Sequence, residues 1–465
     1  CKGRTEYFIT LMRTIIMNRS AKLSLFDFTM IVVSLVIGMG IFRTPVNVAN
    51  AVPSSFVFFA AWLAGGVIAL CGALTYAEIG SRMPVTGAYY KIFSYCYHPS
   101  IAFAVNCIIL ISNAASLAGV ALIGAEYITK VIFPGTVNTQ TTEVIIAVIS
   151  IVIFYGVNLA GLKMSARTQN VLTIIKISMI LLLILPLFFS TSHPAPLLDH
   201  PVLNPTLREY LKAFGIGLVA VSFTYGGYQQ TINFGAEVSR PDKNIPRGIF
   251  IGIFIIISLY LTINYAYIKV IGFENMKGAK GIAAIMASYV FGDAAGKILS
   301  ILLFLSVLAY VNVLLMSNPR VMFAMSEDGV LPKLFSKKTV ARDVLITALT
   351  SFAAMSVLIV FWAKEFDEIL SFTIFLDCIG MALSAGSIFI LRKRKVRPEQ
   401  TEIYQMKLYP LLPVIFISAY TFVAISILVD KPLTALTGLG VLAVFIIIYF
   451  FTRKTPKGNR PALVS

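Results

Sequence analysis

Long runs of apolar residues, separated by short polar connections, recur along the whole chain. Twelve of these runs are each close to the roughly 20 residues that an α-helix needs to cross a bilayer. The pattern predicts an all-α polytopic membrane protein with twelve transmembrane helices, and a short amphipathic helix outside the bilayer at residues 278–293. The predicted spans are residues 25–50, 54–79, 98–124, 142–160, 168–190, 211–236, 247–272, 292–320, 343–363, 368–391, 408–429 and 433–452.

Two of these runs carry paired glycines near their middle, where a helix tolerates them least. The first run contains "VIGMGIF" (residues 36–42) and the sixth contains "SFTYGGYQQ" (residues 222–230). At membrane depth an irregular backbone persists only where protein covers it or where it lines a cavity. We expect both helices to be broken at these glycines, and close helix packing is the structural alternative.

The two expected breaks occupy matching positions in the chain. The sixth run lies five spans after the first, so the two broken helices cross the bilayer in opposite directions, as an inverted repeat requires. A break exposes amide donors and carbonyl acceptors, which suit the carboxylate and the ammonium group of an amino acid. We expect the amides of residues 38–41 to bind the carboxylate and the carbonyls near Ile37, Phe223 and Thr224 to bind the amine. The predicted substrate-binding residues are Ile37, Gly38, Met39, Gly40, Ile41, Phe223, Thr224, Tyr225, Gly226 and Gly227.

Composition and charge distribution support the membrane assignment. The 465 residues are 58% hydrophobic and 13% charged, whereas about a quarter of the residues in a soluble protein are charged. The formal net charge of +17 would suit a nucleic-acid partner, but the basic residues gather in alternate loops, such as "RKRKVR" at 392–397. This positive-inside pattern predicts that both chain ends lie in the cytoplasm and that the partner is the lipid bilayer of the cell membrane, not nucleic acid.

The sequence offers little to a metal ion or an enzyme. The five cysteines have no metal-ligand spacing, and the three histidines lie near span ends or in loops. Residues 191–210 form the longest outer loop, which is too short for the sensor domain of a receptor. We therefore expect no metal, no cofactor, and neither an enzyme nor a receptor. The N-terminal stretch also lacks the features of a cleavable signal peptide.

Two ionisable residues lie inside predicted spans, where such residues are costly and are functional candidates by default. Lys176 either snorkels to the membrane surface or ties the fifth span to backbone carbonyls near Gly38. Asp377 is either a proton carrier or a hydrogen-bonded structural group. Further charges near the inner ends of the spans are expected to pair as an inner gate or a structural clamp: Glu78, Arg82, Glu237, Arg240 and Arg247.

Five stretches, in this order, resemble the amino acid–polyamine–organocation superfamily, most closely its L-type amino acid transporter branch. They are "GMGIF" (38–42), "YAEIGSRMPVTGAYY" (76–90), "NLAGLKMSARTQNVLTIIK" (158–176), "FTYGGY" with "GAEVSRPDKNIPRGI" (223–249), and "NPRVMFAMSEDGVLP" (318–332). The resemblance implies the LeuT-type fold, with five-helix repeats at residues 25–190 and 209–392. Two extra helices follow at 407–452, and residues 1–24 and 453–465 form cytoplasmic ends.

The resemblance also implies roles for single residues. Phe223 takes the place of an aromatic that gates the site from outside, and Tyr267 resembles a tyrosine of the seventh helix in L-type relatives. Lys176 resembles a lysine that substitutes for a sodium ion between the first, fifth and eighth helices, which implies sodium-independent transport.

The implied function is secondary active transport of amino acids by alternating access, as an exchanger or coupled to protons. Small residues expected to face the substrate side chain, among them Ala115, Ser116, Gly119 and Ala309, favour a neutral substrate. A polyamine or cationic amino acid permease is the alternative. It needs an acidic group in the pocket, but acids are scarce in the middle of the spans. Glu126 in the third span is the nearest candidate, and we expect it at the outer end of that span. Oligomeric state is not predicted.

Overall fold

The protein is helical throughout the residues that the computed structural model describes, which are 22–134, 139–189, 206–279, 281–339, 342–362, 366–396 and 403–452. No β-strand occurs in these ranges, where two isolated bridges, Leu23 with Val238 and Thr86 with Phe234, are the whole β-structure. Most of the predicted N-terminal segment and all of the C-terminal tail lie outside the described residues. The prediction of an all-α protein is confirmed for the described part.

Eight helices of the described chain are long and apolar enough to cross a membrane, and α2 with α3 would make a ninth. The chain is therefore a multi-pass membrane protein, and the count of twelve spans stays a prediction. The eight are α4 (Ser55–Arg82), α6 (Pro99–Ile132), α7 (Thr139–Leu159), α8 with α9 (Leu162–Ile184 and Pro186–Phe189), α11 (Pro241–Ile271), α14 (Ala295–Glu327), α16 (Phe366–Lys393) and α17 (Leu411–Asp430).

Further helices fall at the other predicted spans. The first span is divided into α2 (Leu25–Val36) and α3 (Gly40–Ala51), and the sixth contains α10 (Leu207–Thr224). The ninth and twelfth correspond to α15 (Ile346–Trp362) and α18 (Pro432–Thr452). Short helices complete the list: α5 (Ala88–Cys96), α12 (Phe273–Met276), α13 (Ile282–Phe291) and the 3-10 helices η1 (Tyr228–Asn233), η2 (Gly235–Glu237), η3 (Gly292–Ala294) and η4 (Lys333–Ser336). The short helix predicted at 278–293 is thus present as α13.

Local sequence explains where several helices begin and end. Ser24 and Asp27 form a capping box at the start of α2, and the Ser54 side chain accepts a hydrogen bond from the Val57 amide at the start of α4. The α6 helix continues eight residues beyond its predicted end at 124, to Ile132. Glu126 and Lys130 form an i,i+4 ion pair of 2.7 Å on this added stretch, which stabilises a polar end of the helix.

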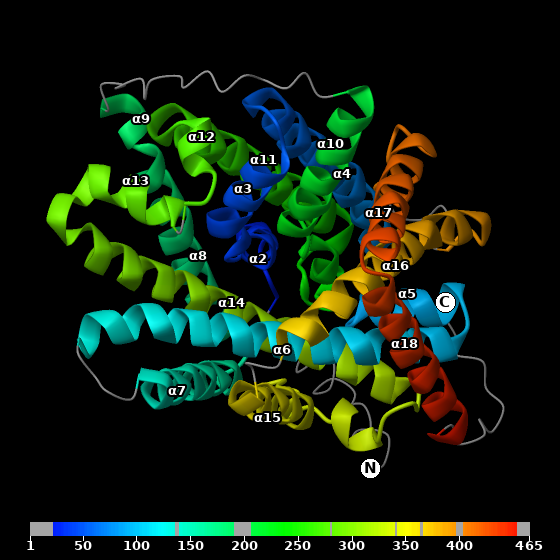
Figure 1. Ribbon diagram of the computed structural model, residues 1–465. Helices are drawn as coiled ribbons and strands as arrows, with labels where there is room; N and C mark the ends of the chain where they lie inside the picture. Colours follow the sequence, from blue (N-terminus) through cyan, green and yellow to red (C-terminus); the bar gives the residue numbers. More distant parts are fainter. Residues whose placement is uncertain are drawn as a thin grey trace, which may run out of the picture.

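The helices pack in layers around the two interrupted segments (Figure 1). Helices α2, α3 and α10 lie near the centre, and residues 28–36 of α2 are all buried. Helix α6 packs against α14, with α7 and α15 on its outer side, while α17 and α18 lie at one flank. Apolar side chains such as Phe450 and Phe451 of α18 are exposed, as a lipid-facing surface requires. The burial pattern therefore places α2, the first half of the broken first span, in the protein interior and not against lipid.

Candidate functional site

The first break lies between α2 and α3. Helix α2 ends at Val36, residues 37–39 are not helical, and α3 resumes at Gly40 with a bend of 41°. In the described chain, no hydrogen-bond acceptor is found for the backbone amides of residues 38–41. The half-helix α3 therefore begins with free amide donors, which carry partial positive charge.

The second break follows α10. The α-helix ends at Thr224, and the chain resumes at Tyr228 as the 3-10 helix η1. Gly227 has φ +111°, and a Cβ atom there would lie 2.3 Å from the carbonyl oxygen of Leu35. Only glycine allows this conformation together with this close approach. The Gly227 amide donates to Oε1 of Gln229 at 2.9 Å, so the side chain next to the glycine pair closes the turn.

The two breaks lie side by side, and the helices that border them, α3 and α10, run antiparallel. Near the breaks, Thr224 donates through Oγ1 to the hydroxyl of Thr44 at 2.8 Å, and its side chain lies next to Gly40. One to two turns further along α3, Val48 and Val52 approach Gly217 of α10. Along this contact the residue numbers of α3 increase while those of α10 decrease, so the two helices are antiparallel. The start of α3 and the end of α10 therefore lie next to each other.

A cavity of about 350 Å³ opens where the breaks meet. We call it the central cavity. Its size lies within the range of small-molecule sites. One wall comes from α2, α3 and the end of α10, and the others come from α6, α14, α16 and α17. Its lining includes Gly38, Met39, Gly40, Thr224, Gly226 and Gly227 of the two breaks, together with Ser112, Asn113, Ser116, Ser222, Gln229, Gln230, Tyr310, Asp377 and Tyr420.

Lys176 lies behind the first break. Its side chain is fully buried, and its ammonium group donates to the carbonyl of Ile37 at 2.6 Å. The Tyr260 hydroxyl donates to the neighbouring carbonyl of Val36 at 3.3 Å. The contact between Lys176 and a carbonyl near Gly38 is the one that the sequence suggested. It also means that the Ile37 carbonyl already has a donor within the protein.

The other predicted site residues have different positions. Ile37, Ile41 and Tyr225 are buried but do not line the central cavity, and Tyr225 packs on Trp62 with ring centroids 5.9 Å apart. Tyr267, the second predicted gate, is buried in α11 and lies outside the cavity lining. The side chain of Phe223 lies outside what the structure describes, and its gating role stays a prediction.

The structure adds a polar wall that sequence reasoning largely missed. The Asn113 side chain donates to Oδ1 of Asn318 at 2.7 Å, and Nε2 of the Gln230 side chain donates to Oδ1 of Asn113 at 3.3 Å. Ser116 and Tyr310 share a hydrogen bond of 2.9 Å between α6 and α14. A signal was present in the sequence, because "ISNAAS" places polar residues 112, 113 and 116 on one face of an apolar span.

Glu126, the acid considered for a cationic substrate, lies elsewhere. It pairs with Lys130 near the end of α6 and is not part of the central cavity lining. Asp377 is the carboxylate that does line it. Glu126 is thus not the acid of the pocket, in keeping with its expected place near a span end. The acid in the cavity is the mid-span Asp377, and its direction depends on how α6 and α16 pack.

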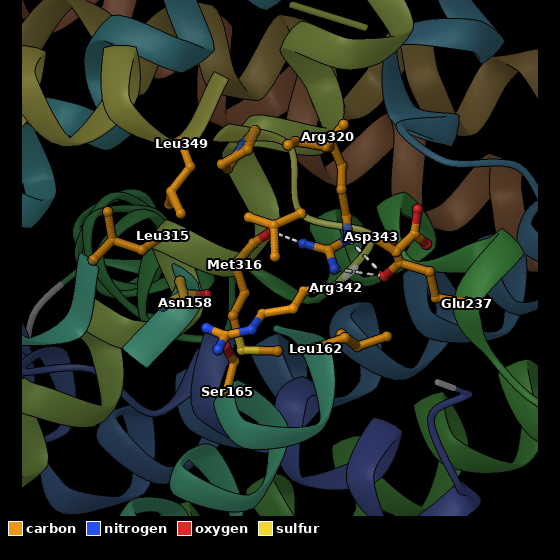
Figure 2. Close-up of a pocket in the computed structure, with 13 residues that line it drawn as sticks. Asn158, Leu162, Ser165, Glu237, Leu315, Met316, Arg320, Arg342, Asp343 and Leu349 are labelled. Carbon is orange, nitrogen blue, oxygen red and sulfur yellow. Dashed lines mark hydrogen bonds and ion pairs between the residues drawn. The ribbon is translucent and has the colours of Figure 1, made fainter. Parts of the chain in front are cut away.

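A second, smaller cavity of about 60 Å³ lies between α14, the junction of α7 and α8, the start of α15, and Glu237 of η2. Figure 2 shows the side chains that line it. Arg320 lies at its edge and donates through Nε to Glu237 at 2.7 Å and through Nη1 to the Met316 carbonyl. The Arg320 guanidinium also stacks over Phe234, 4.4 Å from the ring centroid. We call the end of the molecule that contains this pair the Glu237 end.

Glu78 forms a separate charged cluster at the same end. Its fully buried carboxylate accepts from Arg82 at 2.9 Å and from two nitrogens of Arg392 at 2.8 and 2.6 Å. The backbone amide of Met406 donates to it at 2.9 Å. Among Glu78, Arg82, Glu237, Arg240 and Arg247, the predicted pairing is therefore present for Glu78 with Arg82, but it is wrong for Glu237, whose partner is Arg320. Two clusters form because the ends of α4 and α14 meet different helices.

The comparisons with known proteins agree with this architecture. A family model described as "Amino acid permease" matches residues 23–459. The chain belongs to the amino acid permease family. The match spans both breaks and the whole cavity lining, so this family membership covers the site as well as the fold.

Curated relatives come from the same branch. The serine/threonine exchanger SteT of Bacillus subtilis is 27% identical over 418 residues, which cover 89% of this chain and 92% of the relative. The human large neutral amino acids transporter small subunit 2 is 26% identical, covering 90% and 78%. The human cystine/glutamate transporter is 25% identical, covering 90% and 82%. This permease therefore belongs to the L-type branch of the amino acid–polyamine–organocation superfamily, and it is a transporter and not an enzyme.

Proposed function

We propose that this permease exchanges neutral L-amino acids across the cell membrane by alternating access, without sodium. The observation that carries the proposal is the central cavity, where two antiparallel helix breaks present free backbone groups to one small space. Two relatives, a serine/threonine exchanger and a large neutral amino acids transporter, support a neutral substrate and an exchange mode.

In this proposal the backbone binds the part that all amino acids share. The free amides of residues 38–41 hold the substrate carboxylate, as helix N-termini hold anions. The ammonium group binds carbonyls at the end of α10, near Phe223, Thr224 and Gly226, with Ile37 on the opposite side. The Lys176 bond to the Ile37 carbonyl leaves the α10 carbonyls as the more open acceptors.

We further propose that the transport fold is a LeuT-type inverted repeat. The helices of residues 25–190 form one repeat, those of 209–392 the other, and 407–452 add two more. The opposite directions of α3 and α10 at their contact support this arrangement. The Glu237 end then faces the cytoplasm, as the basic loops suggest, and Phe223 and Tyr267 act as gating aromatics near the opposite end.

Sodium independence rests on Lys176. Its ammonium group lies between α8 and the first break, where it supplies a fixed positive charge to the Ile37 carbonyl. A bound cation at that position would duplicate a charge that the side chain already provides. A proton-coupled mode, with Asp377 as the carrier, is the alternative to exchange.

Uptake by proteoliposomes of the purified chain tests the proposal. Labelled neutral L-amino acid should enter several times faster when the vesicles contain unlabelled amino acid, and replacing sodium with potassium should leave the rate unchanged. An imposed pH gradient should not drive accumulation in vesicles that contain no amino acid. Uptake that requires sodium, or that is driven by the pH gradient without internal substrate, would contradict the exchange mechanism.

A further inference from the structure

The central cavity contains one ionisable acid and no basic side chain. Among the described residues that line it, Asp377 carries the single carboxylate, and Lys, Arg and His do not occur. No hydrogen bond or ion pair to the Asp377 carboxylate is found anywhere in the described chain. A carboxylate inside a membrane span is costly without a partner, so a partner that arrives with the substrate is a physical reason for its presence.

Asp377 lies in the part of the cavity that the broken helices do not form. The same lining includes Cys378 and Met381 of α16, and Ser112 and Ser116 of α6, a helix that packs against α16. Asp377 and Ser112 also line a small cavity of about 40 Å³ between α6, α16 and α18, whose other walls are apolar. A substrate held at its α-carbon by the breaks therefore has room to extend a methylene chain along this corner.

The charge of the site distinguishes between substrate side chains. A zwitterionic amino acid with a neutral side chain adds no net charge and leaves the Asp377 carboxylate unpaired. The other buried charge at the site, the Lys176 ammonium, bonds to the Ile37 carbonyl and does not line the cavity. A substrate with a positively charged side chain would form an ion pair with the Asp377 carboxylate. Both charges would then be buried as a pair, which is how proteins accommodate buried charges.

We propose that Asp377 gives the site a second substrate class, amino acids whose side chain ends in an ammonium or guanidinium group, alongside the neutral amino acids. The inference rests on the proposed function, because the breaks still hold the α-carboxylate and α-ammonium groups. Asp377 is then a specificity-determining residue: it contacts the end of the substrate side chain and takes no part in backbone recognition.

A pair of matched competitors tests this role. L-Lysine and L-norleucine have unbranched side chains that differ chiefly by the terminal ammonium group. In proteoliposomes loaded with unlabelled neutral amino acid, L-lysine should inhibit uptake of the labelled neutral substrate, and labelled L-lysine should itself enter. In Asp377→Asn the ratio of the inhibition constant of L-lysine to that of L-norleucine should rise at least about tenfold, equivalent to about 1.4 kcal/mol.

Two further variants separate charge from structure. Asp377→Glu keeps the carboxylate and should keep the competition by L-lysine. Glu126→Gln makes the same chemical change in a carboxylate that lies outside the central cavity, and it should leave the ratio at its wild-type value. If Asp377→Asn does not fold, the wild-type comparison decides, because L-lysine must inhibit at least as strongly as L-norleucine.

The outcomes distinguish the two proposals. Wild-type vesicles that take up neutral amino acids but neither admit L-lysine nor are inhibited by it would overturn the role of Asp377 and leave the proposed function intact. An unchanged ratio in Asp377→Asn would overturn it equally. Wild-type vesicles that take up no amino acid at all would instead refute the proposed function.

Discussion

The break between α2 and α3 and the break after α10 border the same cavity, but different groups hold them. Side chains from other helices hold the first: Lys176 of α8 and Tyr260 of α11 donate to the carbonyls at the end of α2. The second is held by its own residues, through the positive φ of Gly227 and the side chain of Gln229. The first break therefore depends on distant helices, and the second depends on local backbone geometry.

The two breaks also differ in which backbone groups lack a partner within the described chain. At the first break the carbonyls of Val36 and Ile37 have donors, while the amides that follow have no acceptor in the described chain. At the second break the Gly227 amide has its acceptor, while no donor to the carbonyls of residues 223–226 is found in the described part of the chain. One segment thus offers donors and the other offers acceptors, which is what a zwitterion requires. Three predictions test this comparison.

Gly227→Ala should have the largest effect, because the second break has no substitute for its glycine. A left-handed backbone costs a non-glycine residue about 1–2 kcal/mol, and the added Cβ would also collide with the Leu35 carbonyl. We expect the thermal unfolding midpoint in detergent to fall, and proteoliposome uptake to drop at least about tenfold. Gly156→Ala in α7 is the control, since a Cβ there meets no atom within 4 Å. Uptake at the wild-type rate by Gly227→Ala would refute the view that the backbone geometry of Gly227 holds the second break.

Lys176→Ala should have the next largest effect, because it removes the donor to Ile37 while leaving the α2 sequence intact. Hydrogen bonds to charged groups contribute about 1.5–3 kcal/mol, so uptake should fall about tenfold or more. Initial uptake rates with and without sodium provide the measurement. Lys163→Ala, an exposed lysine on the same helix, should transport normally. If Lys176→Ala transports at the native rate, the first break does not depend on this lysine.

The smallest effect is expected for the hydrogen bond that joins the two breaks. Thr44→Val and Thr224→Val each remove one hydroxyl of the 2.8 Å contact between α3 and α10. A double-mutant cycle of unfolding free energies should give a coupling of about 1 kcal/mol. Strictly additive single-variant effects would show that the two segments are not coupled through this pair.

The features that could be predicted from the sequence are those that one residue type determines locally. Glycine pairs at 38 and 40 and at 226 and 227 predicted the positions of the breaks, because no helix interior favours them. Apolar run length predicted most helices, although α6 and α14 extend further than their apolar cores. Polar helix ends are stabilised by pairs such as Glu126 with Lys130, which hydrophobicity does not detect.

The partners of single side chains could not be predicted, because they lie on helices far apart in the chain. Arg320 pairs with Glu237 across 83 positions, and Glu78 pairs with Arg392 across 314. The facing direction of Asp377 depends in the same way on the packing of α16 against α6. A charge inside a span indicated importance, but only the packing of the helices placed it in the cavity.

The Glu78 cluster has a consequence for which parts of the molecule can move. Its carboxylate, which is fully buried although the Arg392 side chain is 22% exposed, joins α4, α16 and the segment around Met406, and leaving such a buried charge without its partner costs about 3–5 kcal/mol. The Glu237–Arg320 pair keeps 16% and 11% of its side-chain surfaces exposed, so water can replace either partner as it separates. If this end of the molecule opens during the proposed transport cycle, we expect the Glu237–Arg320 pair to separate more readily than the Glu78 cluster, because the Glu237 carboxylate is partly exposed and the Glu78 carboxylate is not.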